Sequence, residues 1–372
     1  MTGLYVHIPF CTKKCHYCNF VITTSRAPGG HTKFLSALEK EIVHRGPDFQ
    51  KTEFDTLYLG GGTPSVMTSE ETSALFDLIR KNFRLKKDAE ITCEINPGDI
   101  DRQKAENYRR MGVNRVSLGA QSFQDQTLKQ LNRSHTAKDI SASFQLLRAT
   151  GFQNIGLDLI LSLPGETLED VKNSVYQLIG LGPEHVSLYE LTIEEKTVFG
   201  NLFKRGELDL PDEDLQIQML SYARPTLKKA NFHHYELLNY AKPGFESRHN
   251  RIYWNNEEYL GLGPGAFSYR NGRRLMFSAS VEEYFEKTGK GDWTAFEEEQ
   301  LTPEKKERES FLLALRLAEG ADTRRFDSLM KKIKNNIEKL EEKELLSREN
   351  GRICLTDRGQ FFAETVFSEL AV

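Results

Sequence analysis

The chain has 372 residues, of which 38% are hydrophobic and 28% are charged, and its formal net charge is −4. This balance is typical of a folded globular protein and excludes global disorder. A charge so close to neutral also excludes a whole-molecule electrostatic attraction to nucleic acid or anionic lipid.

The N-terminal residues indicate a strand and lack the basic start and apolar run of a signal peptide. The most apolar stretch, residues 155–163, contains Asp158 and is too short to cross a bilayer. The five cysteines are an odd number, and Cys11, Cys15 and Cys18 lie close together, unlike a secreted disulfide framework. We therefore expect a cytoplasmic protein with no membrane span, in which this cysteine cluster binds metal.

Apolar, β-branched runs alternate with amphipathic patterns over the first two-thirds of the chain. The expected strands are residues 4–8, 54–59, 90–95, 115–119, 154–161 and 185–191. The expected helices are residues 33–44, 69–82, 102–111, 137–150 and 168–179. This alternation predicts parallel βα units, too few for the usual eight-stranded barrel. The predicted fold is α/β, a partial (β/α)6 barrel over residues 1–211, with its chemistry at the carboxyl ends of the strands.

Residues 212–300 are less regular, with a helix and then an aromatic segment at 249–269, and we interpret them as an extension that closes the open side of the barrel. Residues 301–372 are predicted to form a winged-helix-like C-terminal domain. Its expected elements are helices 304–318 and 330–345, a hairpin around residues 350–351, and a helix from 356 to 370. Residues 331–344 hold five lysines and four glutamates, too few net charges for a groove-reading helix. We therefore expect a packing or docking module and no nucleic-acid partner.

Cys11, Cys15 and Cys18 follow the first expected strand directly. Thiolates are soft ligands that suit zinc or iron–sulfur centres. A structural zinc site needs four closed ligands, and His7 or His16 would have to complete it. A cubane held by three thiolates instead leaves one iron open to a cofactor. From the residues alone, zinc and the absence of any metal stay open as alternatives.

The spacing C-x-x-x-C-x-x-C after a strand resembles the radical S-adenosylmethionine (SAM) superfamily. The resemblance implies a [4Fe–4S] cluster on the three cysteines, whose open iron binds SAM and whose electron can cleave it to a radical. Residues 60–64, Gly-Gly-Gly-Thr-Pro, are similar to the glycine-rich loop of this family.

The motifs taken in order resemble the HemN/HemW branch of the family. The similar segments are residues 4–11, 59–64, 94–97, 119–123, 132–133, 158–160, 247–253 and 259–268. Carried over residue by residue, the resemblance implies that SAM is contacted by Tyr5, Gly61, Gly62, Thr63, Glu94, Gln121, Arg133 and Asp158.

Within the branch, the HemN oxidases carry a fourth cysteine two positions after the third, where this chain has Phe20, and a longer N-terminal extension. The segment 249–254, His-Asn-Arg-Ile-Tyr-Trp, is instead similar to the H-N-x-x-Y-W pattern of the HemW subfamily. That resemblance implies a haem chaperone that binds haem through His249 and passes it to an acceptor such as a respiratory haem protein. Phe267 stands where a histidine is expected in relatives. If that histidine helps to hold haem in them, this chain binds haem differently.

Two other functions are considered. One is a radical SAM enzyme acting on a tetrapyrrole, as an oxygen-independent coproporphyrinogen III oxidase; Phe20 and the short N-terminus speak against it. The other is a DNA-binding regulator, against which the near-neutral tail speaks. Whether SAM is cleaved in the function is left open.

Overall fold

The computed structural model describes residues 1–24 and 30–371. Within them, a twelve-stranded sheet has the order β12-β11-β10-β9-β1-β2-β3-β4-β5-β6-β8-β7. Its centre is the parallel run β1 (Thr2–Ile8), β2 (Glu53–Gly61), β3 (Arg84–Ile95), β4 (Arg115–Gln121), β5 (Ile155–Leu161) and β6 (His185–Glu190). Strands that follow one another in the chain are neighbours here, as is usual for βα units.

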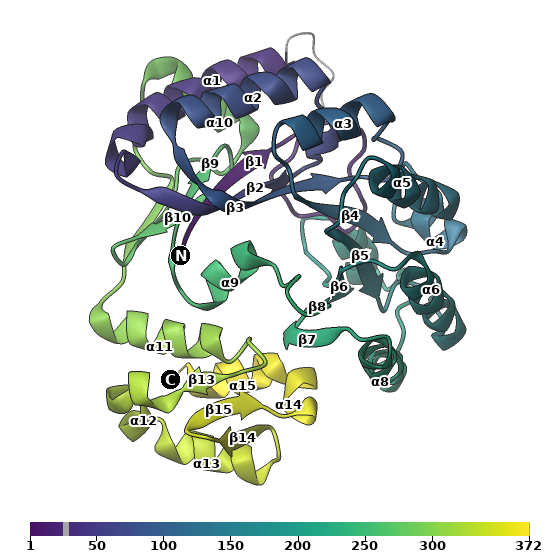
Figure 1. Ribbon diagram of the computed structural model, residues 1–372. Helices are drawn as coiled ribbons and strands as arrows, with labels where there is room; N and C mark the ends of the chain where they lie inside the picture. Colours follow the sequence, from purple (N-terminus) through teal and green to yellow (C-terminus); the bar gives the residue numbers. More distant parts are fainter. Residues whose placement is uncertain (25–29, 372) are drawn as a thin grey trace.

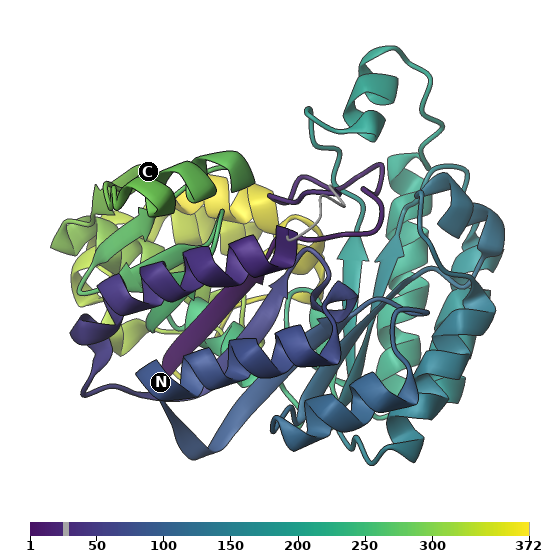
Figure 2. The same ribbon diagram turned by 90° about the horizontal axis from the view of Figure 1, so that it is seen from above.

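Helices cover the outer face of this sheet (Figures 1 and 2). They are α1 (Gly30–Arg45), α2 (Ser69–Asn82), α3 (Arg102–Arg110), α4 (Asp125–Gln130), α5 (Ala137–Ala149) and α6 (Leu168–Leu181). Thr68, Thr136 and Thr167 begin α2, α5 and α6 with capping boxes, which satisfy the free backbone N–H groups at those ends. The strands are apolar on both faces and form the main core with these helices. The predicted partial (β/α)6 barrel is thus confirmed, with α4 as an unpredicted short helix.

The extension lengthens the sheet at both edges. β9 (Glu258–Leu262) pairs in parallel with β1, and β10 (Phe267–Arg270), β11 (Arg273–Met276) and β12 (Glu297–Gln300) follow it antiparallel. At the other edge lie β8 (Asn239–Ala241) and β7 (His233–Glu236). In the part of the chain that the structure describes, strands do not close the barrel, since β12 and β7 are the two edges of the sheet. Instead, α9 (Arg248–Trp254) packs within the curve of the sheet against β1, β2 and β9 (Figure 1).

The remaining helices before residue 300 are α7 (Val198–Lys204), α8 (Glu213–Lys229) and α10 (Val281–Lys290). Short 3-10 turns are η1 (Gly46–Phe49) and η2 (Pro64–Val66). α7 projects beyond the carboxyl ends of the strands, beside the loop after β1 (Figure 2). No helix in residues 1–24 or 30–371 is both long and apolar enough to cross a membrane.

The C-terminal part has a core of its own below the sheet (Figure 1). Its elements are α11 (Pro303–Ala314), β13 (Ala321–Asp322), η3 (Thr323–Arg325), α12 (Asp327–Lys332), α13 (Lys334–Glu342), β14 (Leu346–Glu349), β15 (Arg352–Leu355), α14 (Asp357–Phe361) and α15 (Ala363–Leu370). β15 is the central strand of a three-stranded antiparallel sheet.

Three expected helix bounds differ in this part. The first helix ends at Ala314 rather than 318, because Leu317 forms a β-bridge with Glu236 of the barrel extension. The second is two helices, α12 and α13, which meet at Ile333. The last is two helices, α14 and α15, which meet at Phe362. α14 packs closely on the residue before the hairpin, since a Cβ on Gly359 would lie 1.9 Å from the Leu345 carbonyl oxygen.

Candidate functional site

A cavity of about 400 Å³ opens at the carboxyl ends of the parallel strands. Its walls come from the loop after β1, the glycine loop after β2, and the ends of β3 to β6. Because parallel strands end at one edge, residues far apart in the sequence meet here. Among the predicted site residues, those that line this cavity are Cys11, Cys15, Cys18, Gly61, Gly62, Thr63, Glu94, Gln121, Arg133 and Asp158.

The three cysteines lie on one loop, which we call the cysteine loop (residues 11–18). Backbone hydrogen bonds hold it: the N–H of Cys11 donates to Thr23, and that of His16 donates to Leu131. Burial raises the pKa of Cys11 to about 11 and also raises that of Cys18. The thiols of Cys11 and Cys18 are therefore protonated without a metal, and binding one would release their protons.

Each sulfur has a different polar partner. The Thr63 hydroxyl lies 3.4 Å from Sγ of Cys11, and Nη1 of Arg133 donates to Sγ of Cys15 over 3.4 Å. A backbone N–H at Phe20 acts on Cys18 and lowers its pKa against the larger effect of burial. Such hydrogen bonds to sulfur are the outer contacts that orient and tune iron–sulfur ligands.

A closed zinc site does not fit this arrangement. Among the described residues, no three His, Cys, Asp or Glu side chains converge as around one metal ion. Both nitrogens of His7 are engaged, with the Tyr5 hydroxyl and the Val21 carbonyl, and His16 is bonded through Nδ1 to Gln130. The thiolates of a cubane bind separate irons, so they need not converge on one point.

The glycine loop is set by close backbone packing. At Gly61, φ is +103°, and a Cβ there would lie 2.4 Å from the His7 ring. A Cβ on Gly62 would lie 2.6 Å from the carbonyl oxygen of Phe10. These positions need glycine so that the end of β2 can rest on the start of the cysteine loop, where the N–H of Thr63 donates to Phe10 over 2.8 Å.

Two half-buried carboxyl groups, those of Glu94 and Asp158, face the cavity from β3 and β5. Glu94 accepts from the Tyr58 hydroxyl at 2.7 Å and from the N–H of Gly61 at 3.1 Å. Burial, reinforced by the nearby Asp158, raises the pKa of Glu94 to about 7. Burial also raises the pKa of Asp158, which accepts from the Ser117 hydroxyl at 3.0 Å. Both groups could receive hydroxyl or ammonium donors of a ligand.

Gln121 and Arg133 complete the wall. Gln121 has φ +66°, where the register between β4 and β5 shifts. Arg133 donates through Nη2 to Asn96 and to the Gly119 carbonyl, while its Nε is buried with no hydrogen-bond partner among the described residues. A guanidinium with a free N–H is suited to a carboxylate ligand.

Tyr5 is not part of the cavity wall. It lies in β1, and its hydroxyl is hydrogen-bonded to Nδ1 of His7 at 3.1 Å. Burial holds its pKa well above the usual value. Its predicted contact with SAM stays a prediction, with the side chain one layer behind the cavity.

His249 lies at the amino ends of the strands, away from the cysteine loop. Its Nδ1 is 2.6 Å from the Thr56 hydroxyl and its Nε2 is 2.9 Å from the Tyr253 hydroxyl. The residue is 1% exposed, and burial lowers its pKa to about 3. Both ring nitrogens are thus engaged within the protein, which is the contact pattern of a structural histidine. Haem ligation by His249 would require one of these two contacts to break.

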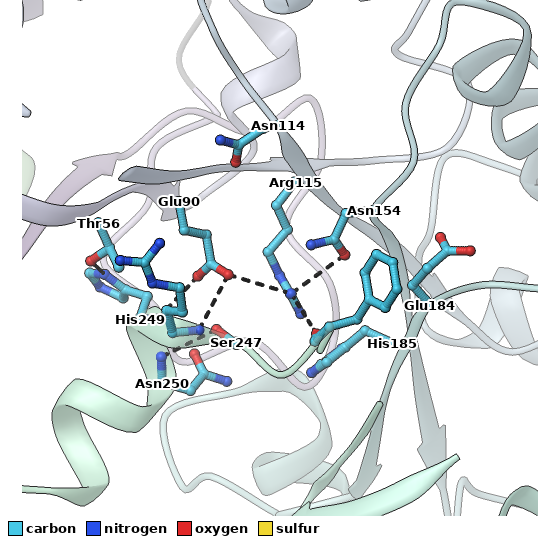
Figure 3. Close-up of polar contacts among 12 residues, drawn as sticks. Thr56, Glu90, Asn114, Arg115, Asn154, Glu184, His185, Ser247, His249 and Asn250 are labelled. Atoms are coloured by element: carbon cyan, nitrogen blue, oxygen red, sulfur yellow. Dashed lines mark hydrogen bonds and ion pairs between the residues drawn. The ribbon is translucent and has the colours of Figure 1, made fainter. Parts of the chain in front are cut away.

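Glu90 and Arg115 hold α9 in this place, and sequence analysis did not single them out. The Glu90 carboxylate accepts from the N–H of His249 at 3.1 Å and lies 3.6 Å from Arg115 (Figure 3). Arg115 also donates to the Phe245 carbonyl at 2.8 Å. The sequence feature that could have predicted this pair is a charged residue at the start of each of two expected apolar strands, 90–95 and 115–119.

Comparison with known proteins places this geometry in a family. The radical SAM superfamily profile matches residues 5–176, and the HemN C-terminal domain profile matches residues 301–362. The heme chaperone HemW of Bacillus subtilis (strain 168) is 34% identical, over 99% of this chain and 98% of its own. The heme chaperone HemW of Lactococcus lactis is 36% identical, over 98% and 96%.

In fold, the chain is similar to the solved structure of coproporphyrinogen III oxidase (HemN) from Escherichia coli, a radical SAM enzyme. The TM-score is 0.88 at 24% identity, and the match covers 99% of this chain and 89% of the other. At that identity the likeness concerns the fold alone. By the full-length similarity to its curated relatives, the chain belongs to the HemW family of the radical SAM superfamily.

Proposed function

We propose that this protein is a haem chaperone that binds haem and delivers it to a haem-accepting protein, of which a respiratory haem enzyme is one class. The observation that carries the proposal is the similarity, over almost the whole chain, to relatives named heme chaperone HemW. We place it in the cytoplasm, because its cysteines are free thiols and iron–sulfur ligands need a reducing compartment.

We also propose a [4Fe–4S] cluster on Cys11, Cys15 and Cys18, with SAM in the adjoining cavity. The donor set fits: soft thiols with polar partners, two half-buried carboxyls, and a guanidinium with a free N–H. Glu94 would hold the amino group of SAM, Arg133 its carboxylate and Asp158 its ribose, with Gln121 and the glycine loop closing the wall. When bound, the cluster supplies the electron for reductive cleavage of SAM.

The cluster is tested by iron and sulfide analysis after anaerobic reconstitution. The protein should hold about four irons and four sulfides, and Cys15→Ala should lose them. Cys93→Ala is the matched control, because Cys93 is fully buried in β3 and does not line the cavity. Full iron content in Cys15→Ala would refute the assignment.

Haem binding is tested by titration followed through the Soret band, and haem delivery by transfer to an apo haem protein. His249 stays the predicted axial ligand. Tyr253→Phe removes the hydroxyl that engages Nε2, so it should strengthen haem binding if His249 is the ligand. His249→Ala should then weaken it. An unchanged Soret band and affinity in both variants would show that the iron is bound elsewhere.

The second candidate is oxygen-independent oxidation of coproporphyrinogen III, which the fold likeness to HemN makes worth testing. Phe20 stands in place of the fourth cysteine and is 65% exposed at the cavity rim. We expect no protoporphyrinogen IX by product chromatography. Turnover well above that of the cluster-free Cys15→Ala protein would favour the oxidase.

A further inference from the structure

Arg133 connects the cysteine loop to the cavity wall. It follows α4 and comes directly after Asn132, whose φ of +62° turns the chain so that Arg133 points inward. The side-chain amide of Asn132 donates to the Lys14 carbonyl at 2.8 Å. Its Nη2 is fixed by Asn96 and by the Gly119 carbonyl at 3.0 Å. The guanidinium is therefore held in one orientation, with Nη1 on Sγ of Cys15 at 3.4 Å.

The three sulfurs differ in the charge of their partners. Cys11 is contacted by a neutral hydroxyl and Cys18 by a backbone N–H, whereas Cys15 is contacted by a cation. Lys14 also bears a positive charge on this loop, but it is exposed and no hydrogen bond joins its ammonium group to a sulfur in the described chain. Arg133 is thus the half-buried cation in direct contact with a cluster thiol.

We propose that Arg133, besides any role in binding SAM, raises the reduction potential of the cluster through its contact with Sγ of Cys15. The proposal rests on the [4Fe–4S] assignment above. Reduction adds one negative charge to the cluster, and a fixed cation hydrogen-bonded to a ligand sulfur stabilises the reduced state more than the oxidised one. Because Arg133 and the three cysteines are half-buried, solvent screens this charge less than it screens an exposed one. Arg133 is therefore a positioning residue that makes the cluster easier to reduce.

The test is a potentiometric titration followed by electron paramagnetic resonance, with SAM absent so that cofactor binding does not contribute. Arg133→Gln keeps a donor but removes the charge, and its potential should shift to a more negative value. Arg133→Lys keeps the positive charge but has a single ammonium group in place of the forked guanidinium. Its potential should therefore lie between that of Arg133→Gln and that of the unmodified protein. Lys14→Gln is the control for charge without contact and should shift the potential less.

The outcomes separate this inference from the proposed function. An unmodified protein without four irons would refute the cluster itself. A loaded Arg133→Gln protein whose potential equals the unmodified one, or shifts no more than Lys14→Gln, would overturn the inference alone. If Arg133→Gln does not load iron, the potentials of Arg133→Lys and Asn96→Ala test the inference instead. Asn96→Ala removes an acceptor that orients the Arg133 guanidinium. Unchanged potentials in both would overturn the inference, and a negative shift in either would support it.

Discussion

Glu94 lines the cavity and changes its charge close to neutral pH. Its pKa of about 7, set mainly by burial, leaves the carboxyl neutral below that pH and charged above it. The folded-state pKa lies above the ordinary value of 4.5, so the proton stabilises the unliganded protein. This contribution is complete below about pH 4.5 and is lost as the pH rises through about 7.

The same titration predicts the pH dependence of SAM binding. If Glu94 pairs with the amino group, the dissociation constant should fall about tenfold between pH 6 and pH 8, as measured by isothermal titration of the reconstituted protein. Glu94→Gln should bind more weakly and without this dependence. Glu166→Gln is the control, since burial raises that pKa to about 8 but Glu166 lies outside the cavity. An unchanged pH profile in Glu94→Gln would exclude the pairing.

At the scale of elements, the contact between the glycine loop and the cysteine loop determines the shape of the site. Gly62→Ala places a Cβ 2.6 Å from the backbone of Phe10, which cannot move without shifting the cysteine loop. We expect Gly62→Ala to reduce iron content after reconstitution and to lower the free energy of unfolding.

Gly180 is the matched comparison because it lies in α6 with no atom within 4 Å of an added Cβ. Gly180→Ala should raise the free energy of unfolding by about 0.5–1 kcal/mol and leave iron content unchanged. Equal effects of the two substitutions would show that close packing at Gly62 is unimportant.

The position of α9 depends on the ion pair between Glu90 and Arg115, whose side chains are 7% and 4% exposed. Arg115→Met leaves the Glu90 carboxylate buried beside the start of α9 without its cation. The expected loss is about 3–5 kcal/mol of unfolding free energy by chemical denaturation. Arg273→Met, which breaks the exposed pair with Glu298, should cost about 1 kcal/mol or less. Similar costs for both variants would contradict the role given to the buried pair.

At the scale of the whole molecule, the core of the C-terminal part and the main core of the sheet are joined by contacts of several kinds. The bridge between Glu236 and Leu317, the ion pair of Arg251 with Glu319, and the stacking of Arg316 on Trp254 connect the C-terminal part to the sheet extension. Among residues 301–371, none lines the cavity at the carboxyl ends of the strands. The division at residue 301 is therefore proposed as a functional one.

A chain ending at residue 300 should retain about four irons and bind SAM with the affinity of the full chain. Its solubility should fall, because Trp254 and the edge strand β7 lose their cover. Iron analysis and isothermal titration check this expectation. Loss of the cluster from a truncated chain whose circular dichroism still indicates the α/β fold would show that the C-terminal part supports the site.

What the sequence determined by itself is local or periodic. The cysteine loop is contiguous, so its three cysteines could be proposed as cluster ligands from their spacing together with the family resemblance. The strands and capped helices follow from apolar period and from Thr68, Thr136 and Thr167, because such signals act within a few residues. The alternation of these elements was then enough to predict the parallel sheet and the edge at which Glu94 and Asp158 meet.

The tertiary structure decided what depends on contacts between distant segments. Leu317 pairs with Glu236, and this shortens α11. The pairing could not be predicted, because the two residues are far apart in the chain. Arg133 could be predicted to face SAM, but its contact with Cys15 required the loop after α4 to fold back on the cysteine loop. His249 shows the difference most plainly: its sequence pattern suggested an available ligand, whereas packing against Thr56 and Tyr253 engages both ring nitrogens, because burial of an imidazole requires partners for its polar atoms.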